Sequence, residues 1–324
     1  MRQEKISELE NAVAREHSNI TGIVVQKDCE KLYEKYLNGY NSENTVHLFS
    51  VTKSIVSILI GIAIDKGLIK SLDTKVLDFF PDYTPLAGEK TIHNITVKNL
   101  MTMTAPYKYD KEPYVEFFIS ENPIRTALDY LGGDKPIGKF NYAGIGGTHI
   151  LSGILTKAIG EPILEFAKRN LFTPLNIDVP QNVVIHDEKE HGLVMNDNNT
   201  KGWVIDPQGN NIASWGLFMT PKEMAKIGLL YLNNGVWNGQ QIVSDKWIIE
   251  STAEQSRCEE FGLGYGYLWW LIDNESFAAM GDGGIIIYVN TKKQLSISIA
   301  AFFIPDAKIR IELIKNFVEP IFDD

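Results

Sequence analysis

The chain has 324 residues, 44% hydrophobic and 22% charged, an ordinary composition for one large globular unit. Its formal net charge of −10 argues against nucleic acid as a partner, because DNA and RNA binding needs a basic surface. Two cysteines without a CxxC pair exclude a disulfide framework. The charged N-terminus and the short apolar run at 55–64 indicate neither a signal peptide nor a membrane span. We therefore expect a cytoplasmic protein without a membrane partner.

The first 70 residues are expected to contain two helices with two strands between them. Residues 4–17 carry apolar side chains at helical spacing among charged ones, the pattern of an amphipathic helix. Strands are expected at 22–26 and 32–37, with a turn at 27–30. Residues 50–66 would be apolar on every side of a helix, which is typical of a helix at the centre of a protein.

Residues 70–210 are mostly helical in pattern, with polar loops. Residues 187–209 are polar and contain glycine, so we expect a long surface loop there. A further amphipathic helix is expected at 221–233, where Asn-Asn-Gly then ends it. The helix candidates before it are 96–103, 113–120, 123–131, 146–158 and 161–171.

The last part of the chain returns to strands, expected at 266–272, 284–289 and 295–303, before a helix at 307–317. Combined with the first two strands, they predict an α+β fold with a five-stranded antiparallel sheet built from both chain ends. Terminal helices would flank this sheet in a layered arrangement. We expect a single catalytic unit over 1–324, in which 1–70 and 210–324 form the sheet part and 71–209 a mostly helical insertion.

The segment Ser50-Val51-Thr52-Lys53 carries the strongest chemical signal. A spacing of three residues places the hydroxyl and the amine on one face of the helix. A serine hydroxyl is a weak nucleophile until a base takes its proton, and a buried lysine can be that base in its neutral form. Ser50 would also lie at the start of the helix, where free backbone N–H groups favour negative charge. The alternative is an N-cap serine that has no role in catalysis.

Two further elements would complete such a site. Tyr142 precedes a glycine-rich helix start, so its hydroxyl could relay a proton to a leaving group. The motif Asp282-Gly283-Gly284-Ile285 leads into an apolar strand, whose edge a substrate could approach closely. The backbone N–H groups of Ile285 and Ser50 could then bind the oxyanion. Taken separately, a packed tyrosine and a plain glycine-rich hairpin explain both elements equally well.

In this order the three elements resemble the motifs of the serine β-lactamase-like superfamily. It includes class C β-lactamases, DD-peptidases, related esterases and hydrolases of aminohexanoate oligomers. The resemblance extends over HLFSVTKSIVSILIGIAIDKGLIKSLDTKVLDFFP (47–81), ITVKNLMTMT (95–104) and SWGLFMTPKEMAKIGLLYLNNGVWNGQQIVSDKW (214–247). It covers about residues 20–305, and the fold it implies agrees with the sheet and insertion deduced above.

The resemblance implies that Ser50 is the nucleophile, Lys53 its base partner and Tyr142 the proton relay. Two positions depart from the family pattern. Gly144 stands where the family usually has asparagine, and Asp282 where it usually has lysine, histidine or tryptophan. A cation at the second position helps penicillin-acting enzymes to bind the substrate carboxylate, which an aspartate would repel. We therefore expect poor activity on β-lactams.

We expect a serine hydrolase that cleaves small amides or esters through an acyl-enzyme on Ser50. One alternative is a penicillin-binding, D-amino-acid peptidase or β-lactamase activity, and another is a non-catalytic binding or regulatory homologue. No cofactor is expected, and no metal either, because the sequence has no H-E-x-x-H motif or comparable spacing. The expected partner is a small-molecule substrate of unknown identity, and the oligomeric state stays open.

Overall fold

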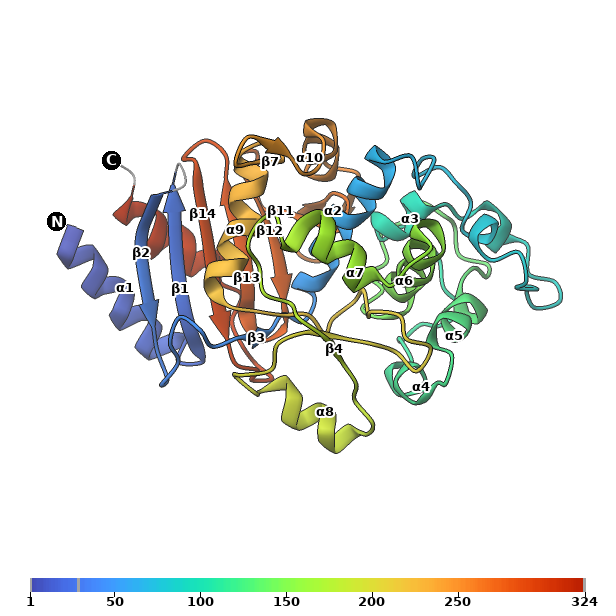
Figure 1. The fold of residues 1–324 in the computed structure, drawn as a ribbon, viewed down its shortest axis with the longest axis horizontal. Helices are drawn as coiled ribbons and strands as arrows, with labels where there is room; N and C mark the ends of the chain where they lie inside the picture. The colour runs from blue at the N-terminus through green and yellow to red at the C-terminus, as the bar shows by residue number, and fades with distance from the viewer. Residues whose placement is uncertain (1, 28–29, 323–324) are drawn as a thin grey trace.

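The computed structural model describes residues 2–27 and 30–322 and contains one large antiparallel sheet formed by both ends of the chain (Figure 1). Its strands are β1 Ile20–Lys27, β2 Glu30–Tyr36, β9 Ser256–Cys258, β10 Leu263–Tyr265, β11 Trp270–Leu271, β12 Ser276–Gly281, β13 Ile285–Asn290 and β14 Leu295–Ala301. They follow the order β2-β1-β14-β13-β12-β11-β10-β9. Ile299 of β14 lies opposite Ile23 on one side and Ile286 on the other, so strands from the two ends of the chain pair directly within the sheet.

The predicted α+β fold with a sheet from both chain ends is confirmed, but the sheet has eight strands where five were expected. β12 was missed because its sequence, SFAAMG, contains no β-branched residue and consists mostly of small ones. The strand expected at 266–272 is in fact the turn that follows β10, in which Leu268 has a φ of +61°, and the short strand β11. Asp28 and Cys29 of the expected turn lie outside the described residues.

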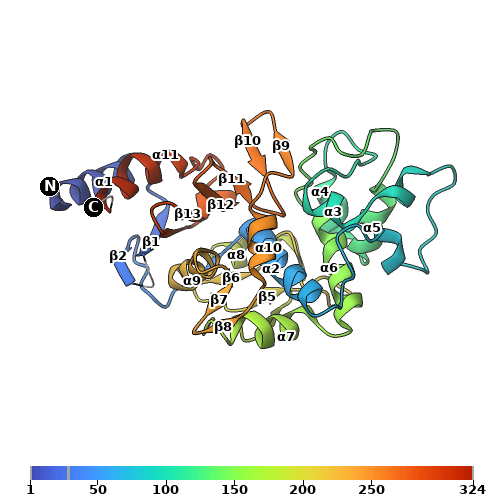
Figure 2. The same cartoon turned by 90° about the horizontal axis from the view of Figure 1, so that it is seen from above.

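Helices cover both faces of the sheet (Figures 1 and 2). On one face, α1 (Arg2–Glu16) packs beside α11 (Ile311–Leu313), which continues through a π-helical turn at Ile314–Val318 and a 3-10 turn at Glu319–Ile321. On the other face lie α2 (Val51–Asp65) and α9 (Pro221–Leu232). Residues of β13 alternate between these two cores, since Ile286 faces the first and Ile287 the second.

Helices also dominate the segment between α2 and α9. Residues 187–209, expected as a surface loop, contain α8 (Glu188–Met195), because the Asp187 side chain accepts the Glu190 N–H and caps the helix start. The end of that segment is core, since Trp203 is fully buried and its Nε1 donates to the Ile212 carbonyl at 2.8 Å. The other helices are α3 Val97–Met101, α4 Tyr114–Ile119, α5 Pro123–Tyr130, α6 Gly146–Ile159 and α7 Ile163–Ala167, with a π-helical turn at Lys168–Phe172 and 3-10 turns at Val76–Phe79 and Thr91–Asn94.

Short elements connect the layers. The small strands β3 and β6 pair next to the start of α2, and α10 packs along it, where the ring of Trp247 fills the space beside Gly61. The short elements are β3 Val46–His47, β4 Asn182–Val183, β5 Trp203–Val204, β6 Phe218–Met219, β7 Val236–Trp237, β8 Gln240–Gln241 and α10 Asp245–Ser251.

The centre of the molecule is α2, in which every residue from Val51 to Ala63 is buried. This is the central helix expected from its apolar sequence. It begins at Ser50, beside the end of β12, so the helix start meets the edge of the sheet. Over residues 2–27 and 30–322, no helix combines the length and the apolarity needed to cross a bilayer.

Candidate active site

Ser50 lies at the N-cap of α2 with its side chain free of any capping hydrogen bond. The preceding residue, Phe49, has a φ of +46°, a backbone conformation that bulky residues rarely adopt and that is concentrated at functional sites. The Phe49 N–H donates to Nδ1 of His47 at 3.2 Å, which holds this bend. The bend presents the Ser50 hydroxyl at the helix start, where backbone N–H groups and the helix dipole favour a developing negative charge.

The Lys53 amine lies against the Ser50 hydroxyl. Its Nζ is 2.8 Å from Ser50 Oγ and also donates to the Ser214 carbonyl at 3.1 Å. Lys53 is only 2% exposed, and among the described residues no carboxylate forms an ion pair with it. Burial lowers the pKa of Lys53 from 10.5 to about 8, against the opposing effect of the negative charges on Asp282 and Glu112. The amine is therefore available in its neutral form near physiological pH.

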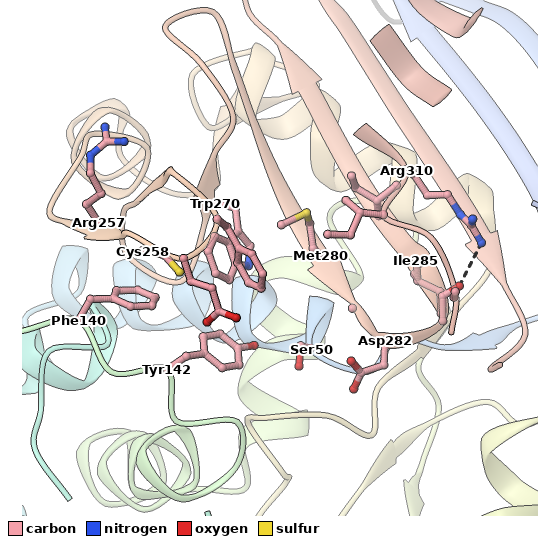
Figure 3. A pocket seen from close by; sticks show the side chains of 18 of the residues that line it. Ser50, Phe140, Tyr142, Arg257, Cys258, Trp270, Met280, Asp282, Ile285 and Arg310 are labelled. Carbon is pink, nitrogen blue, oxygen red and sulfur yellow. Dashed lines mark hydrogen bonds between the residues drawn. The ribbon is translucent and has the colours of Figure 1, made fainter. Parts of the chain in front are cut away.

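Tyr142 reaches the same hydroxyl from the loop before α6 (Figure 3). Its ring stacks on Trp270 with 5.8 Å between ring centroids, and Lys53 Nζ lies 5.5 Å from the Tyr142 centroid. One side of Tyr142 stays open to the pocket, since the residue is 39% exposed. Burial of the other side raises the Tyr142 pKa to about 12, while its hydrogen bond with Ser50 acts in the opposite direction. The structure thus brings together the alcohol, amine and phenol predicted from the sequence.

Residues Asp282 to Ile285 line the same pocket as Ser50. They form a 3-10 turn between β12 and β13, in which Gly283 and Gly284 have φ values of +76° and +80°. Asp282 is exposed, its carboxylate lies beside Ser50 in Figure 3, and no described cation pairs with it. Ile285 is opposite Gly281 in the β12–β13 pairing, at the sheet edge next to Ser50.

The glycines of this motif make room for protein groups as well as for the pocket. A Cβ atom at Gly284 would lie 2.7 Å from Nε of Arg310, and one at Gly283 would lie 3.3 Å from the Phe303 Cα. The Gly283 carbonyl accepts from Asn19 Nδ2 at 2.8 Å and from Arg310 Nη2 at 3.2 Å. The motif is therefore anchored from behind, on the side away from Ser50.

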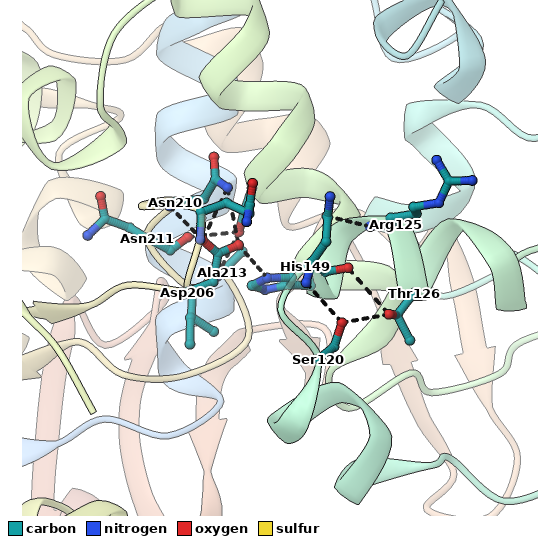
Figure 4. Close-up of polar contacts among 12 residues, drawn as sticks. Ser120, Arg125, Thr126, His149, Asp206, Asn210, Asn211 and Ala213 are labelled. Carbon is teal, nitrogen blue, oxygen red and sulfur yellow. Dashed lines mark hydrogen bonds and ion pairs between the residues drawn. The ribbon is translucent and has the colours of Figure 1, made fainter. Parts of the chain in front are cut away.

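A buried polar network holds the carbonyl that accepts from Lys53 (Figure 4). His149 of α6 contacts Asp206 at 3.1 Å between Nε2 and Oδ2. One turn later, Ser152 Oγ donates to the Asn211 carbonyl at 2.8 Å and accepts from the Ala213 N–H at 3.0 Å. These bonds tie the chain just before Ser214 to α6, which fixes the Ser214 carbonyl beside Lys53.

The pocket above Ser50 has a volume of about 1080 Å³ and mixed lining. Aromatic side chains form one wall, and charged residues of both signs lie along the rim. The hairpin of β9 and β10 overhangs it, opposite the β12–β13 turn. The lining residues that bear on the chemistry are Phe140, Tyr142, Phe261, Trp270, Met280 and Asp282.

Within the described part of the chain, no three His, Cys, Asp or Glu side chains gather in a way that could hold a metal ion. Sequence reasoning did not identify three of the groups near Ser50: the Ser214 carbonyl, Glu112 and the close approach of Gly281. Only Gly281 had a signal in the sequence, as part of the glycine-rich motif.

Comparison with known proteins places the chain in a family. The sequence model of the family described as Beta-lactamase matches residues 10–302. Among curated proteins, the 6-aminohexanoate-dimer hydrolase of Paenarthrobacter ureafaciens is 24% identical over 285 residues. That alignment covers 80% of this chain and 66% of the relative, so the chain spans just under two thirds of the relative's length.

Solved structures share the fold at low sequence identity. A penicillin-binding protein homologue from Caulobacter crescentus matches with a TM-score of 0.74 and 16% identity, covering 98% of this chain and 96% of the other. A family VIII carboxylesterase matches with a TM-score of 0.72 and 16% identity, covering 98% and 97%. Since the family model spans most of the sequence, the chain belongs to the Beta-lactamase family, as the resemblance of its motifs led us to expect.

Proposed function

We propose that this protein is a serine hydrolase that cleaves small amides or esters through an acyl-enzyme on Ser50. The observation that carries the proposal is the 2.8 Å contact between Lys53 Nζ and Ser50 Oγ in a buried setting where no described carboxylate neutralises the amine. With a pKa of about 8, roughly a tenth of Lys53 is neutral at pH 7. That fraction is enough for a general base, since proton transfer is most effective when the catalytic pKa lies near the working pH.

Acylation begins when Ser50 Oγ attacks the substrate carbonyl carbon and its proton passes to Lys53 Nζ. The new C–O bond leaves a negative charge on the carbonyl oxygen. Backbone N–H groups of Ser50 and Ile285, from the start of α2 and the sheet edge, are the donors we assign to that oxyanion. The positive end of the α2 dipole stabilises the same charge.

Collapse of this intermediate breaks the bond to the leaving amine or alcohol. Tyr142 donates its hydroxyl proton to the leaving atom and recovers one from Lys53, whose Nζ lies 5.5 Å from the Tyr142 ring centroid. A phenol with a pKa near 12 stays protonated until that moment. In deacylation a water attacks the acyl carbon while the Tyr142 hydroxyl accepts its proton and passes its own to neutral Lys53 Nζ, and Lys53 then returns a proton to Ser50 Oγ as the acyl bond breaks.

The pocket and the relatives support the proposed substrate class. A volume of about 1080 Å³ with an aromatic wall accepts a small acyl donor. The relatives carry the names of a 6-aminohexanoate-dimer hydrolase and a carboxylesterase, and one mechanism at Ser50 would serve both amide and ester bonds. Asp282 would repel the carboxylate of a β-lactam, so penicillins should acylate Ser50 poorly.

The experiment is covalent labelling with a fluorophosphonate probe, together with turnover of p-nitrophenyl acetate. The wild-type protein should carry one label on the peptide containing Ser50, and Ser50→Ala should lose both the label and the turnover. Ser54→Ala is the matched control, because Ser54 lies one turn along α2 and its Oγ donates to the Leu268 carbonyl instead. Labelling and turnover that persist in Ser50→Ala would reject the proposal.

Two other outcomes would favour the alternative functions. A stable penicilloyl adduct on Ser50 at micromolar drug would indicate a penicillin-binding peptidase. Wild-type protein that neither reacts with the probe nor turns over any ester or amide would indicate a binding homologue. In that case Ser50→Ala should also leave the biological role of the protein unchanged.

A further inference from the structure

A carboxylate from a distant loop binds the backbone directly after Tyr142. Glu112 Oε2 accepts the Gly144 N–H at 2.6 Å, and Oε1 accepts the N–H groups of Ile145 and Gly146 at 2.9 and 2.7 Å. The Tyr109 hydroxyl also lies 3.4 Å from Oε1. One side chain thus binds three consecutive backbone donors, and these donors lie two to four residues after Tyr142 in the chain.

These donors belong to the start of α6, which needs an acceptor from outside. Its N-cap residue, Ile145, has no polar side chain and provides no capping bond. The first N–H groups of a helix have no partner within it, and the positive end of the helix dipole favours an anion. Glu112 supplies both the acceptors and the negative charge, which fixes the direction in which the Tyr142 loop enters α6.

The space that Glu112 occupies is the space an asparagine side chain at position 144 would need. A Cβ atom at Gly144 would lie 2.9 Å from Glu112 Oε2 and 3.0 Å from the Tyr114 hydroxyl. A real Cβ atom does not come this close without displacing its neighbours. The glycine at position 144, where the family usually has asparagine, therefore leaves the room that the Glu112 carboxylate occupies.

The charge of Glu112 also reaches the catalytic groups. Its negative potential raises the pKa of Lys53 and the pKa of Tyr142, in each case alongside Asp282. At Lys53 this effect opposes burial, which is the largest effect on the Lys53 pKa and lowers it. Removal of the Glu112 charge should consequently lower both pKa values.

We propose that Glu112 is a positioning residue for catalysis, which takes the place of the missing side chain at Gly144 and holds Tyr142 against Ser50. It does so through the backbone of residues 144–146 and never contacts the substrate. This inference rests on the proposed function, since it needs Tyr142 to act on the leaving group.

The test is a double-mutant cycle on the turnover of p-nitrophenyl acetate. Glu112→Ala should lower kcat on the order of 10-fold to 100-fold with a smaller change in KM, because Tyr142 loses its alignment. Gly144→Ala should cause a similar loss, since its new Cβ displaces Glu112. The double variant should be little worse than Glu112→Ala alone, because the nearer of the two groups that the new Cβ meets is gone and only the Tyr114 hydroxyl remains. Losses that simply multiply would overturn the inference.

A second readout separates positioning from stability. Glu112→Gln keeps most of the packing but removes the charge, so the rising limb of the pH profile of kcat/KM should move to lower pH as the Lys53 pKa falls. The control is Glu116→Gln on α4, whose carboxylate contacts the Tyr130 hydroxyl and is not among the charges acting on Lys53. An unshifted profile with unchanged kcat in Glu112→Gln would contradict the inference even if Glu112→Ala fails to fold.

Ser50→Ala distinguishes a failure of the inference about Glu112 from a failure of the proposed function. If Ser50→Ala abolishes turnover while the variants at 112 and 144 keep it, the inference about Glu112 is wrong and the function stands. If Ser50→Ala keeps full turnover, the proposed function itself is wrong.

Discussion

Gly281, the last residue of β12, packs against the backbone nitrogen of Ser50. A Cβ atom at position 281 would lie 3.2 Å from that nitrogen and 2.6 Å from the Leu48 carbonyl oxygen. Both are backbone atoms, so neither can move aside without displacing the start of α2. The absent side chain is what allows the edge of the sheet and the nucleophile to share one pocket.

Gly281→Ala should therefore disturb the oxyanion donors and the fold together. Overpacking against backbone costs about 1–3 kcal/mol in the free energy of unfolding, and a displaced Ser50 should lower kcat/KM on the order of 100-fold. Urea denaturation and ester turnover measure the two effects. Gly192→Ala in α8 is the control, since a Cβ there meets nothing within 4 Å; it should leave turnover unchanged and should not lower the free energy of unfolding, because Ala is about 0.5–1 kcal/mol more favourable than Gly inside a helix. Wild-type turnover in Gly281→Ala would show that this contact is not needed.

Lys53→Met should make the protein inactive but more stable at neutral pH. The folded state holds the Lys53 pKa near 8, while in the unfolded chain it returns to about 10.4. Between these values the unfolded chain binds more protons, so the free energy of unfolding of the wild type rises with pH through this window. Below pH 8 the wild type carries the full penalty of burying this charge, on the order of 1–3 kcal/mol after lost hydrogen bonds are allowed for.

Denaturation curves at pH 7 and pH 10 test this prediction. Lys53→Met should exceed the wild type in stability at pH 7, and the difference should shrink toward pH 10. Lys66→Met is the matched control, because it removes an amine at the exposed end of α2 and not a buried one. A Lys53→Met protein that is less stable at both pH values would mean that the amine is favourably bound in its charged form.

Much of the fold could be predicted because its long elements carry strong local patterns. The helix expected at 50–66 runs from Val51 to Asp65, and the strand expected from 295 begins at Leu295. β12 could not be predicted this way, since its sequence lacks β-branched residues and forms a strand only because β11 and β13 provide hydrogen bonds on both sides. Tertiary contacts determine its structure more than its own sequence does.

The same distinction applies to the site. Ser50 and Lys53 lie one turn apart on a helix, and such a spacing can be read directly. The Ser214 carbonyl and the Glu112 carboxylate act through distances of 3.1 and 2.6–2.9 Å that no spacing in the sequence encodes. A backbone carbonyl has no residue signature, and Glu112 is one acidic residue among several in its loop.

Asp282→Asn should make Ser50 more reactive toward β-lactams. The substitution removes an exposed carboxylate beside Ser50 that would repel the β-lactam carboxylate. We expect the rate constant for acylation by nitrocefin to increase on the order of 10-fold, since one unfavourable charge contact at a solvated site is worth about 1.4 kcal/mol or less. Turnover of a neutral ester should change far less.

Glu260→Gln is the matched control for this comparison. Glu260 lines the same pocket, but its charge is not among those acting on Lys53. A similar gain in both variants would attribute the effect to the overall pocket charge and not to the position of Asp282. No gain in Asp282→Asn would show that other features exclude β-lactams.

Arg310 anchors the β12–β13 turn from behind the pocket. It is 1% exposed, and its guanidinium donates to Nδ1 of His17, to the Asn19 side chain and to the Gly283 carbonyl. Desolvation lowers the pKa of His17 to about 4, and the neighbouring charge of Arg310 acts in the same direction. His17 is therefore neutral at physiological pH, which leaves its Nδ1 able to accept from the arginine.

Arg310→Leu should lower stability and turnover together, because it leaves buried acceptors at Asn19 and Gly283 without a charged donor. We expect a loss of about 2–4 kcal/mol in the free energy of unfolding, since hydrogen bonds to charged groups contribute more than neutral ones. Arg257→Leu is the control, because Arg257 is an exposed residue of β9 that lines the same pocket, and its guanidinium bonds Glu254 and the Gly262 carbonyl at the surface. That variant should stay within about 0.5 kcal/mol of the wild type. If Arg310→Leu lost no more stability than Arg257→Leu, the turn that carries Asp282 would have to be held by its own backbone alone.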